Sequence, residues 1–376
     1  MDSRNRFLFV DLLRGAALTV MIEVHVFNTF LIPEYRDALW FPFLNFINGL
    51  VAPSFIFISG FAFILSSKSG LDEMRSFKWK FWRKLGMIAL IFLVAYSMHI
   101  PFFSFKNILI WASPSDLKSF YNVDVLQCIG AALLILFFSR LAIRSDRLFH
   151  IFTITMALVF TLFAPVLWNT DFSIFMPLPL ACYFNEMNGS YFPIFPWAGF
   201  LFAGAAVSTY YLKARETFIE KDFIKKLFIF GLTSAVICFI ILAWLDTFSW
   251  FQLKPSPLFF LERFGAVAVL LSACWYYYRN TGAAAGFFLD VSRQSLVVYW
   301  LHLQLIYRRL WNDRSLSSIA YGNFGIDECL LATAILLAAM MTTAYTWGWI
   351  KQERPVLANI IFYVTIYGSI ALFFII

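Results

Sequence analysis

The sequence predicts an all-α fold, a polytopic integral membrane helical bundle of about 11 transmembrane helices. Hydrophobic residues make up 61% of the 376 residues and charged residues only 14%, against about 25% charged in an ordinary soluble domain. A soluble fold of this size could not bury so much apolar surface behind so few charges. The same composition excludes a disordered chain and a disulfide-rich scaffold.

A spanning helix needs roughly 20 mostly apolar residues, and eleven segments of the chain meet this requirement. We expect them at about 8–32, 43–66, 85–105, 124–143, 150–168, 193–212, 227–245, 258–278, 291–310, 329–349 and 358–376. The sequence shows no internal repeat and no stretch with the composition of a soluble domain. It therefore predicts a single transmembrane domain over residues 1–376.

The distribution of basic residues predicts the orientation of these helices. If the N-terminus is cytoplasmic, roughly three quarters of the 29 Lys and Arg residues fall in cytoplasmic loops. An odd number of spans then places the C-terminus on the extracytoplasmic side. The net charge of +7 is explained by this topology, so we expect no nucleic-acid partner. The lipid bilayer is the expected surrounding.

The cysteines predict neither a disulfide framework nor a metal site. They are scattered, without a CxxC pair or a Cys/His cluster at metal-ligand spacing, at Cys128, Cys182, Cys238, Cys274 and Cys329.

Ionisable residues within a span are costly and therefore indicate function. Arg14 and His25 lie eleven residues apart in the first span, which places them about 20° from a common helical face and about 16 Å apart along the axis. Asp11, three residues before Arg14, is placed to pair with it. A structural alternative is a packing stripe with a snorkelling Arg14 and a satisfied His25.

The ninth span carries a second polar stripe. Ser295, Tyr299 and His302 stand at i, i+4 and i+7 and share one face. They could line a polar channel or act as hydrogen-bonding glue between helices.

Asp124 and Gln127 open the fourth span on the outer side. Asp124 is expected at about the depth of His25, where a carboxylate could orient an imidazole and raise its basicity. The alternative is an ordinary helix cap. His99 and His150, near helix ends, are weaker candidates.

Two loops are candidate binding surfaces. The inner loop 67–84 is the most basic stretch, a pattern that either anionic-ligand binding or topology alone would produce; its cations are Lys68, Arg75, Lys78, Lys80, Arg83 and Lys84. The long outer loop 169–192 is the candidate lid or acceptor surface, or else only a connection whose aromatic residues form an interfacial belt. Its polar residues include Asp171, Asn185, Glu186 and Asn188, and Trp197 follows at the mouth of the next helix.

Four segments, in order along almost the whole chain, resemble the membrane catalytic domain of the heparan-alpha-glucosaminide N-acetyltransferase family and its bacterial relatives. They are RFLFVDLLRGAALTVMIEVH at the start, VDVLQCIGAALL at 123–134, FPIFPWAGFLFAGAAV at 192–207 and SRQSLVVYWLHLQLIY at 292–307. The spacing of Arg14 and His25 is also similar to that of the acyltransferase-three family, which modifies extracytoplasmic glycans.

The resemblance implies a multi-pass protein of the bacterial inner (plasma) membrane that transfers an acetyl group from cytoplasmic acetyl-CoA to an extracytoplasmic glycan or amino sugar. A general base in the outer half would deprotonate the acceptor, and phosphates of the acyl-CoA donor would meet inner cations. The expected catalytic residues are His25, Arg14, Asp124 and His302. The expected donor-binding residues are Arg14, Arg75, Lys78, Lys80, Arg83 and Lys84. The expected acceptor-binding residues are Ser295, Tyr299, Glu186, Asn188 and Trp197.

A secondary transporter or flippase is the alternative, because it would use the same intramembrane His, Arg and Asp side chains. The sequence has no pair of similar halves and no matching broken helices, which favours the acetyltransferase. A homo-oligomer is a further candidate assembly.

Overall fold

The computed structural model describes residues 7–67, 70–248, 251–281, 286–309 and 314–375. These residues form helices and no strand, which confirms the all-α prediction. They group into two compact units that are described separately here. Unit 1 comprises Met1–Val51, Ile100–Ser113 and Tyr278–Ile376, and unit 2 comprises Ala52–His99 and Pro114–Tyr277.

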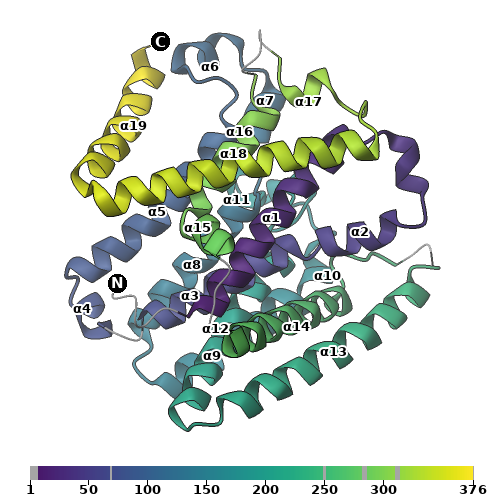
Figure 1. Cartoon of the computed structure of the whole chain (residues 1–376), viewed down its shortest axis with the longest axis vertical. Helices are drawn as coiled ribbons and strands as arrows, with labels where there is room; N and C mark the ends of the chain where they lie inside the picture. Colours follow the sequence, from purple (N-terminus) through teal and green to yellow (C-terminus); the bar gives the residue numbers. More distant parts are fainter. Residues whose placement is uncertain (1–6, 68–69, 249–250, 282–285, 310–313, 376) are drawn as a thin grey trace. The chain divides into compact units, whose positions relative to one another are not determined.

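Unit 1 is organised around α1 (Leu8–Phe30), the purple helix of Figure 1, which packs against α15 (Gly286–Arg293), α16 (Ser295–Tyr307) and α18 (Ile326–Glu353). Helix α1 ends close before Pro33, because a proline disfavours helical backbone in the residue before it. Its C-terminal end contributes Phe27 and Phe30 to a buried cluster that includes Ile306 of α16. The other elements of unit 1 are η2 (Pro33–Asp37), α2 (Phe41–Asn48), α6 (Phe105–Trp111), α17 (Leu316–Ile319) and α19 (Pro355–Ile375).

Unit 2 has its most extensive packing between α9 (Asp146–Leu162) and α12 (Ile194–Glu216). Phe160 of α9 stacks on Phe202 of α12 with ring centroids 5.5 Å apart. The remaining elements are α3 (Val51–Ser67), α4 (Leu71–Arg75), α5 (Trp79–His99), α7 (Pro114–Phe120), α8 (Val125–Ala142), α10 (Ala164–Leu167), η3 (Phe172–Ile174), α11 (Leu178–Ala181), α13 (Glu220–Leu245) and α14 (Pro257–Thr281).

Two glycines allow helices α3 and α12 to cross at close range within unit 2. A Cβ atom on Gly60 would lie 1.9 Å from the main-chain oxygen of Leu201, and one on Gly204 would lie 2.0 Å from that of Phe57. In a bilayer, helices associate through such close packing because lipid offers apolar side chains the same environment as a neighbouring helix. Gly60 and Gly204 therefore fix this crossing.

Each of the eleven predicted segments overlaps a helix. Seven helical stretches of the described residues are long and apolar enough to cross a membrane: Phe41–Ser67, Trp79–His99, Val125–Ala142, Glu220–Leu245, Pro257–Thr281, Ile326–Glu353 and Pro355–Ile375. The number of crossings, eleven, and the sides of the two termini remain predictions.

Several predicted segments differ in detail. The second is divided between α2 and α3, and the fifth is divided between α9 and α10. The ninth is divided at Gln294, whose φ of −109° and ψ of 25° separate α15 from α16. The third lies earlier than expected, as α5 (Trp79–His99). The predicted loop 67–84 is therefore wrong in part, since it contains α4 and the first turns of α5.

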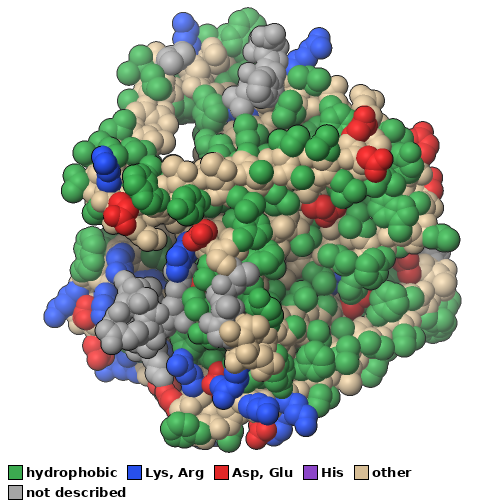
Figure 2. Space-filling model, in the orientation of Figure 1, with side chains coloured by type: hydrophobic (Ala, Val, Ile, Leu, Met, Phe, Trp, Pro, Cys, Tyr) green, Lys and Arg blue, Asp and Glu red, His purple; other side chains and the backbone are tan. Residues whose placement is uncertain are grey.

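Hydrophobic side chains cover much of the molecular surface. On the face drawn in Figure 2 they extend over the long helices α13 and α18, and α19 exposes residues such as Val364 (65%) and Ile375 (78%). In water such surfaces would cause association, whereas lipid solvates them. The chain is a multi-pass membrane protein.

Candidate functional site

The N-terminal half of α1 carries the predicted ion pair. Arg14 Nη1 lies 3.4 Å from Asp11 Oδ1, which confirms the pairing expected from their spacing. Asp11 is buried and also accepts a hydrogen bond of 3.3 Å from Ser292 Oγ of α15. Gly15 packs so closely on α15 that a Cβ atom would lie 2.2 Å from the Phe288 main-chain oxygen. The polar face of α1 is therefore turned toward α15.

The C-terminal half of α1 presents His25 to α16. Its Nδ1 lies 3.1 Å from the hydroxyl of Tyr307, and that hydroxyl lies 2.9 Å from Thr29 Oγ1. Thr29 is one turn beyond His25 on α1. The three side chains form a continuous chain of groups that can exchange a proton.

His302 of α16 lies beside His25, with ring centroids 5.3 Å apart. Its Nδ1 is 2.7 Å from the main-chain oxygen of Val298. A carbonyl only accepts, so Nδ1 carries the proton and Nε2 of the neutral ring presents a lone pair. Nε2 is buried and has no hydrogen-bond partner among the described residues. The site thus holds two imidazoles, one of which has a fixed tautomer.

A cavity of about 470 Å³ opens beside this pair at the C-terminal ends of α1 and α16. It is lined by Asn28, Thr29, Tyr307, Ser317, Ser318 and Tyr321. Main-chain hydrogen bonds of 3.1 Å from Gly322 to Thr29 and of 2.8 Å from Phe324 to Phe30 hold the segment after α17 against the end of α1. Tyr307 belongs to both the cavity wall and the proton chain, so it connects the cavity with His25.

The polar stripe predicted in the ninth span exists in α16. Tyr299 is buried, and its ring contacts the ring of His302 edge to face at 5.9 Å between centroids. Ser295 begins the helix and is half-buried. Neither residue lines the cavity.

Asp124, in unit 2, is the cap of α8. Its Oδ1 accepts a hydrogen bond of 2.7 Å from the Val125 main-chain N–H, and Gln127 completes a capping box. Within the same unit, His99 Nε2 lies 4.0 Å from the second carboxylate oxygen. The capping alternative is confirmed, and a catalytic role for Asp124 remains a proposal.

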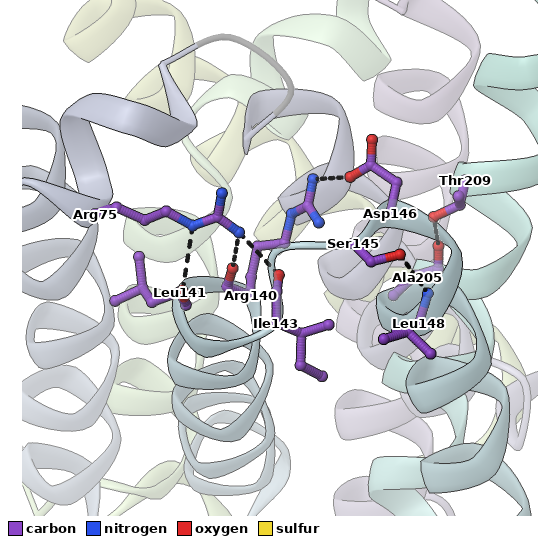
Figure 3. A network of polar contacts seen from close by, with 9 residues as sticks. All are labelled: Arg75, Arg140, Leu141, Ile143, Ser145, Asp146, Leu148, Ala205 and Thr209. Atoms are coloured by element: carbon purple, nitrogen blue, oxygen red, sulfur yellow. Dashed lines mark hydrogen bonds and ion pairs between the residues drawn. The ribbon is translucent and has the colours of Figure 1, made fainter.

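The basic loop divides into structural and exposed cations. Arg75 donates to the last turn of α8, from Nε to Leu141 O at 3.2 Å and from Nη2 to Arg140 O at 3.2 Å and Ile143 O at 2.8 Å (Figure 3). The Nζ of Lys84 is buried against Ser66 Oγ and lies 4.8 Å from the centroid of the Phe63 ring. These two cations hold helices together.

The other cations of the loop face outward. Lys78 and Arg83 are exposed, and the Lys80 ammonium lies 2.9 Å from the Glu73 carboxylate. Lys68 lies outside the described residues.

The outer loop 169–192 is folded onto the start of α8. The buried Asn185 amide donates to the main-chain oxygens of Leu167 and Thr170 at 2.9 and 2.6 Å. Ser190 accepts from Val123 N at 3.0 Å and donates to Cys182 O at 2.7 Å. This polar framework gives the loop a defined conformation.

The predicted acceptor residues of this region differ in exposure. Glu186 is exposed and lies 3.7 Å from Lys254, whereas Asn188 is buried. Trp197 is only 5% exposed and packs edge to face on Phe192 and Phe259, so it belongs to the interior of unit 2. Hydrogen bonds from the Ser173 hydroxyl and N–H lower the pKa of the exposed Asp171.

Sequence reasoning missed two features. Tyr307 is five residues after His302 and about 140° away around the helix, so the polar stripe did not include it. Glu262 and Arg263 form an ion pair of 3.3 Å within α14, with Glu262 buried. Their charge inside an apolar span was a signal that could have identified them.

Fold and site together define a polytopic helical membrane protein with paired imidazoles beside an open cavity. The chain belongs to the family described as heparan-alpha-glucosaminide N-acetyltransferase, catalytic, whose model matches residues 6–242, well over half of its length. It is therefore a transmembrane acetyltransferase of that family. His25 lies inside the matched range and His302 beyond it. No curated protein matches the chain.

No group of three or more His, Cys, Asp and Glu side chains in the described part of the chain is arranged to hold a metal ion.

Proposed function

We propose that this protein transfers the acetyl group of cytoplasmic acetyl-CoA to a hydroxyl or amino group of a sugar or glycan on the extracytoplasmic side of the plasma membrane. The observation that carries the proposal is the imidazole pair of His25 and His302, in a chain of an acetyltransferase family. Acyl transfer from a thioester needs a base for the acceptor proton and a polar group for the developing oxyanion. The site offers both kinds of group.

His25 is the general base of the proposed reaction. Its Nδ1 is hydrogen-bonded to the Tyr307 hydroxyl, which reaches the cavity. His302 is the neighbouring imidazole, and the Val298 carbonyl fixes its tautomer. Its Nε2 lone pair is available to accept a proton or to orient a polar group of the substrate.

The donor approaches from the side of the basic loop. Exposed Lys78 and Arg83, together with Lys80, are the cations available for the phosphates of coenzyme A. Arg14 in unit 1, whose guanidinium is held by Asp11, is a further proposed donor contact. The uncharged pantetheine arm would present the thioester to His25.

The acceptor side is defined by the direction of the helices. With a cytoplasmic N-terminus, α1 runs outward, so His25 and the cavity at its end lie in the outer half of the protein. The outer loop, with Glu186 and Asn188, supplies further acceptor contacts in unit 2. Tyr299 and Ser295 complete the polar face of α16.

The proposal is tested by incubating purified protein with radiolabelled acetyl-CoA and a membrane-glycan extract. We expect label in the glycan with the wild type and a loss of about 10²–10⁴-fold in His25→Ala, because the base contributes that much. Thermal stability in detergent is measured in parallel and should change little. Full transfer by folded His25→Ala would eliminate the assignment of the base. Unlabelled glycan with every preparation of folded wild type would contradict the proposed reaction.

A further inference from the structure

The cavity beside Tyr307 is built for a neutral ligand. Among the described residues, its lining consists of one amide, three aliphatic hydroxyls and two phenols, all of them side chains of the uncharged polar type. Arg36 does not line the cavity, but its Nη2 donates to the main-chain oxygen of Asn28, a lining residue, at 2.9 Å. Glu34 and Asp37 flank Arg36 in the sequence, but neither lines the cavity.

The cavity lining should bind an alcohol more favourably than an ammonium group. A protonated amine entering the cavity would lose part of its hydration and meet no carboxylate among the described lining residues. A sugar hydroxyl exchanges its water for the hydroxyls of Thr29, Ser317 and Ser318, while the rings of Tyr307 and Tyr321 offer faces for its C–H groups.

We propose that this cavity binds the acceptor as a neutral polyhydroxyl compound, and that Tyr307 passes the proton of the acceptor hydroxyl to His25 during O-acetylation. This inference rests on the proposed function and adds the class of acceptor and a further catalytic residue. An acceptor bound in the cavity would contact Tyr307. The hydroxyl of Tyr307 is hydrogen-bonded to His25, at 3.1 Å, and to Thr29, at 2.9 Å.

The proposed step balances. The acceptor oxygen attacks the thioester carbon, a C–O bond forms and the C–S bond breaks. The acceptor proton moves to Tyr307 Oη while the phenol's own proton moves to Nδ1 of neutral His25. That proton then reaches the coenzyme A sulfur, so the products are an acetyl ester and the free thiol. Tyr307 ends as it began, and Thr29 orients its hydroxyl.

The test uses two probes that differ in a single group, methyl β-glucoside and its 2-amino-2-deoxy analogue at pH 6, where the amine is protonated. The full-length protein in nanodiscs is supplied with labelled acetyl-CoA, and release of free thiol and label in each glycoside are measured. Mild hydroxylamine cleaves esters and leaves amides intact. We expect hydroxylamine-labile label in the glucoside, at a rate at least about 10-fold above that in the amino analogue, because the site leaves the ammonium unpaired. Preference for the amino analogue, or a hydroxylamine-stable product, would overturn the inference and leave acetyl transfer intact.

Variants test the role of Tyr307. Tyr307→Phe keeps the ring and removes the hydroxyl, so kcat should fall by about 100-fold while the acceptor KM changes by less than about 3-fold. Tyr363→Phe, on α19 and 53% exposed, is the matched control and should retain wild-type kinetics. A wild-type kcat in Tyr307→Phe would refute the relay.

Binding without the donor separates this inference from the proposed function. Methyl β-glucoside should bind the wild type in a calorimetric or NMR titration, and Asn28→Trp, which fills the cavity from an exposed position on α1, should abolish this binding. Binding that is lost in Asn28→Trp, with no acetyl transfer to any acceptor, would support the cavity and contradict the reaction. Binding that Asn28→Trp leaves unchanged would contradict the cavity.

Discussion

Replacing Arg75 by alanine should destabilise the protein rather than act mainly on the donor. Its guanidinium donates to three main-chain carbonyls of the last turn of α8 and its cap, at 2.8–3.2 Å. Carbonyls at a helix C-terminus have no N–H partner within the helix. Each hydrogen bond contributes about 1 kcal/mol net, so Arg75→Ala should lower the free energy of unfolding by about 3 kcal/mol.

The measurement is unfolding in detergent, followed by tryptophan fluorescence. Arg83→Ala is the matched control, because it removes an exposed cation of the same loop, and it should change stability by less than about 0.5 kcal/mol. The affinity of the folded protein for coenzyme A should fall more in Arg83→Ala than in Arg75→Ala. If Arg75→Ala unfolds like the wild type and loses donor affinity instead, the structural assignment of Arg75 is wrong.

Three further predictions concern the helix crossing, the α8 cap and the donor site. Gly60→Ala should lower the midpoint of thermal unfolding by several degrees, since its Cβ would meet a main-chain oxygen at 1.9 Å, whereas Gly86→Ala, with no atom within 4 Å, should not; equal midpoints would contradict the close crossing. Asp124→Ala should cost about 1 kcal/mol of unfolding free energy, and Asp124→Asn should restore most of it; if Asp124→Asn is stable but inactive in the acetyl-transfer assay, the carboxylate acts in catalysis. Charge reversal at Lys78 and Arg83 should weaken coenzyme A binding and make the residual binding less dependent on salt, and an unchanged titration would leave these cations as topology signals alone.

The fold was accessible from the sequence where local pattern determines structure. Apolar length alone placed every segment on a helix, because a bilayer requires backbone hydrogen bonds to be satisfied within the segment. The break at Gln294 was not predictable, since no proline or glycine lies within SRQSLVVY. In the structure Gln294 accepts a hydrogen bond of 2.9 Å from Lys351 of α18, a tertiary contact that no local pattern encodes. Helix α5 begins at Trp79 and includes the buried Lys84, whose contacts with Ser66 and Phe63 are likewise tertiary.

In the candidate site, too, local contacts were predictable from the sequence and tertiary contacts were not. The Asp11–Arg14 pair and the Tyr299–His302 stripe are local, so helical spacing predicted them. The hydrogen bond from Tyr307 to His25 joins residues 282 positions apart, and Arg75 reaches carbonyls 65 to 68 positions away. Both contacts depend on how helices pack, and a single sequence does not record this.

The account's central claim is that an acetyl group crosses the membrane through the site at His25. Proteoliposomes loaded with the membrane-glycan extract and supplied externally with labelled acetyl-CoA, which does not cross lipid, test this most directly. We predict label on the enclosed glycan with the wild type and a loss of about 10²–10⁴-fold in His25→Ala reconstituted to the same density. Label that forms only when donor and glycan share a compartment, or equal labelling by His25→Ala, would contradict the claim.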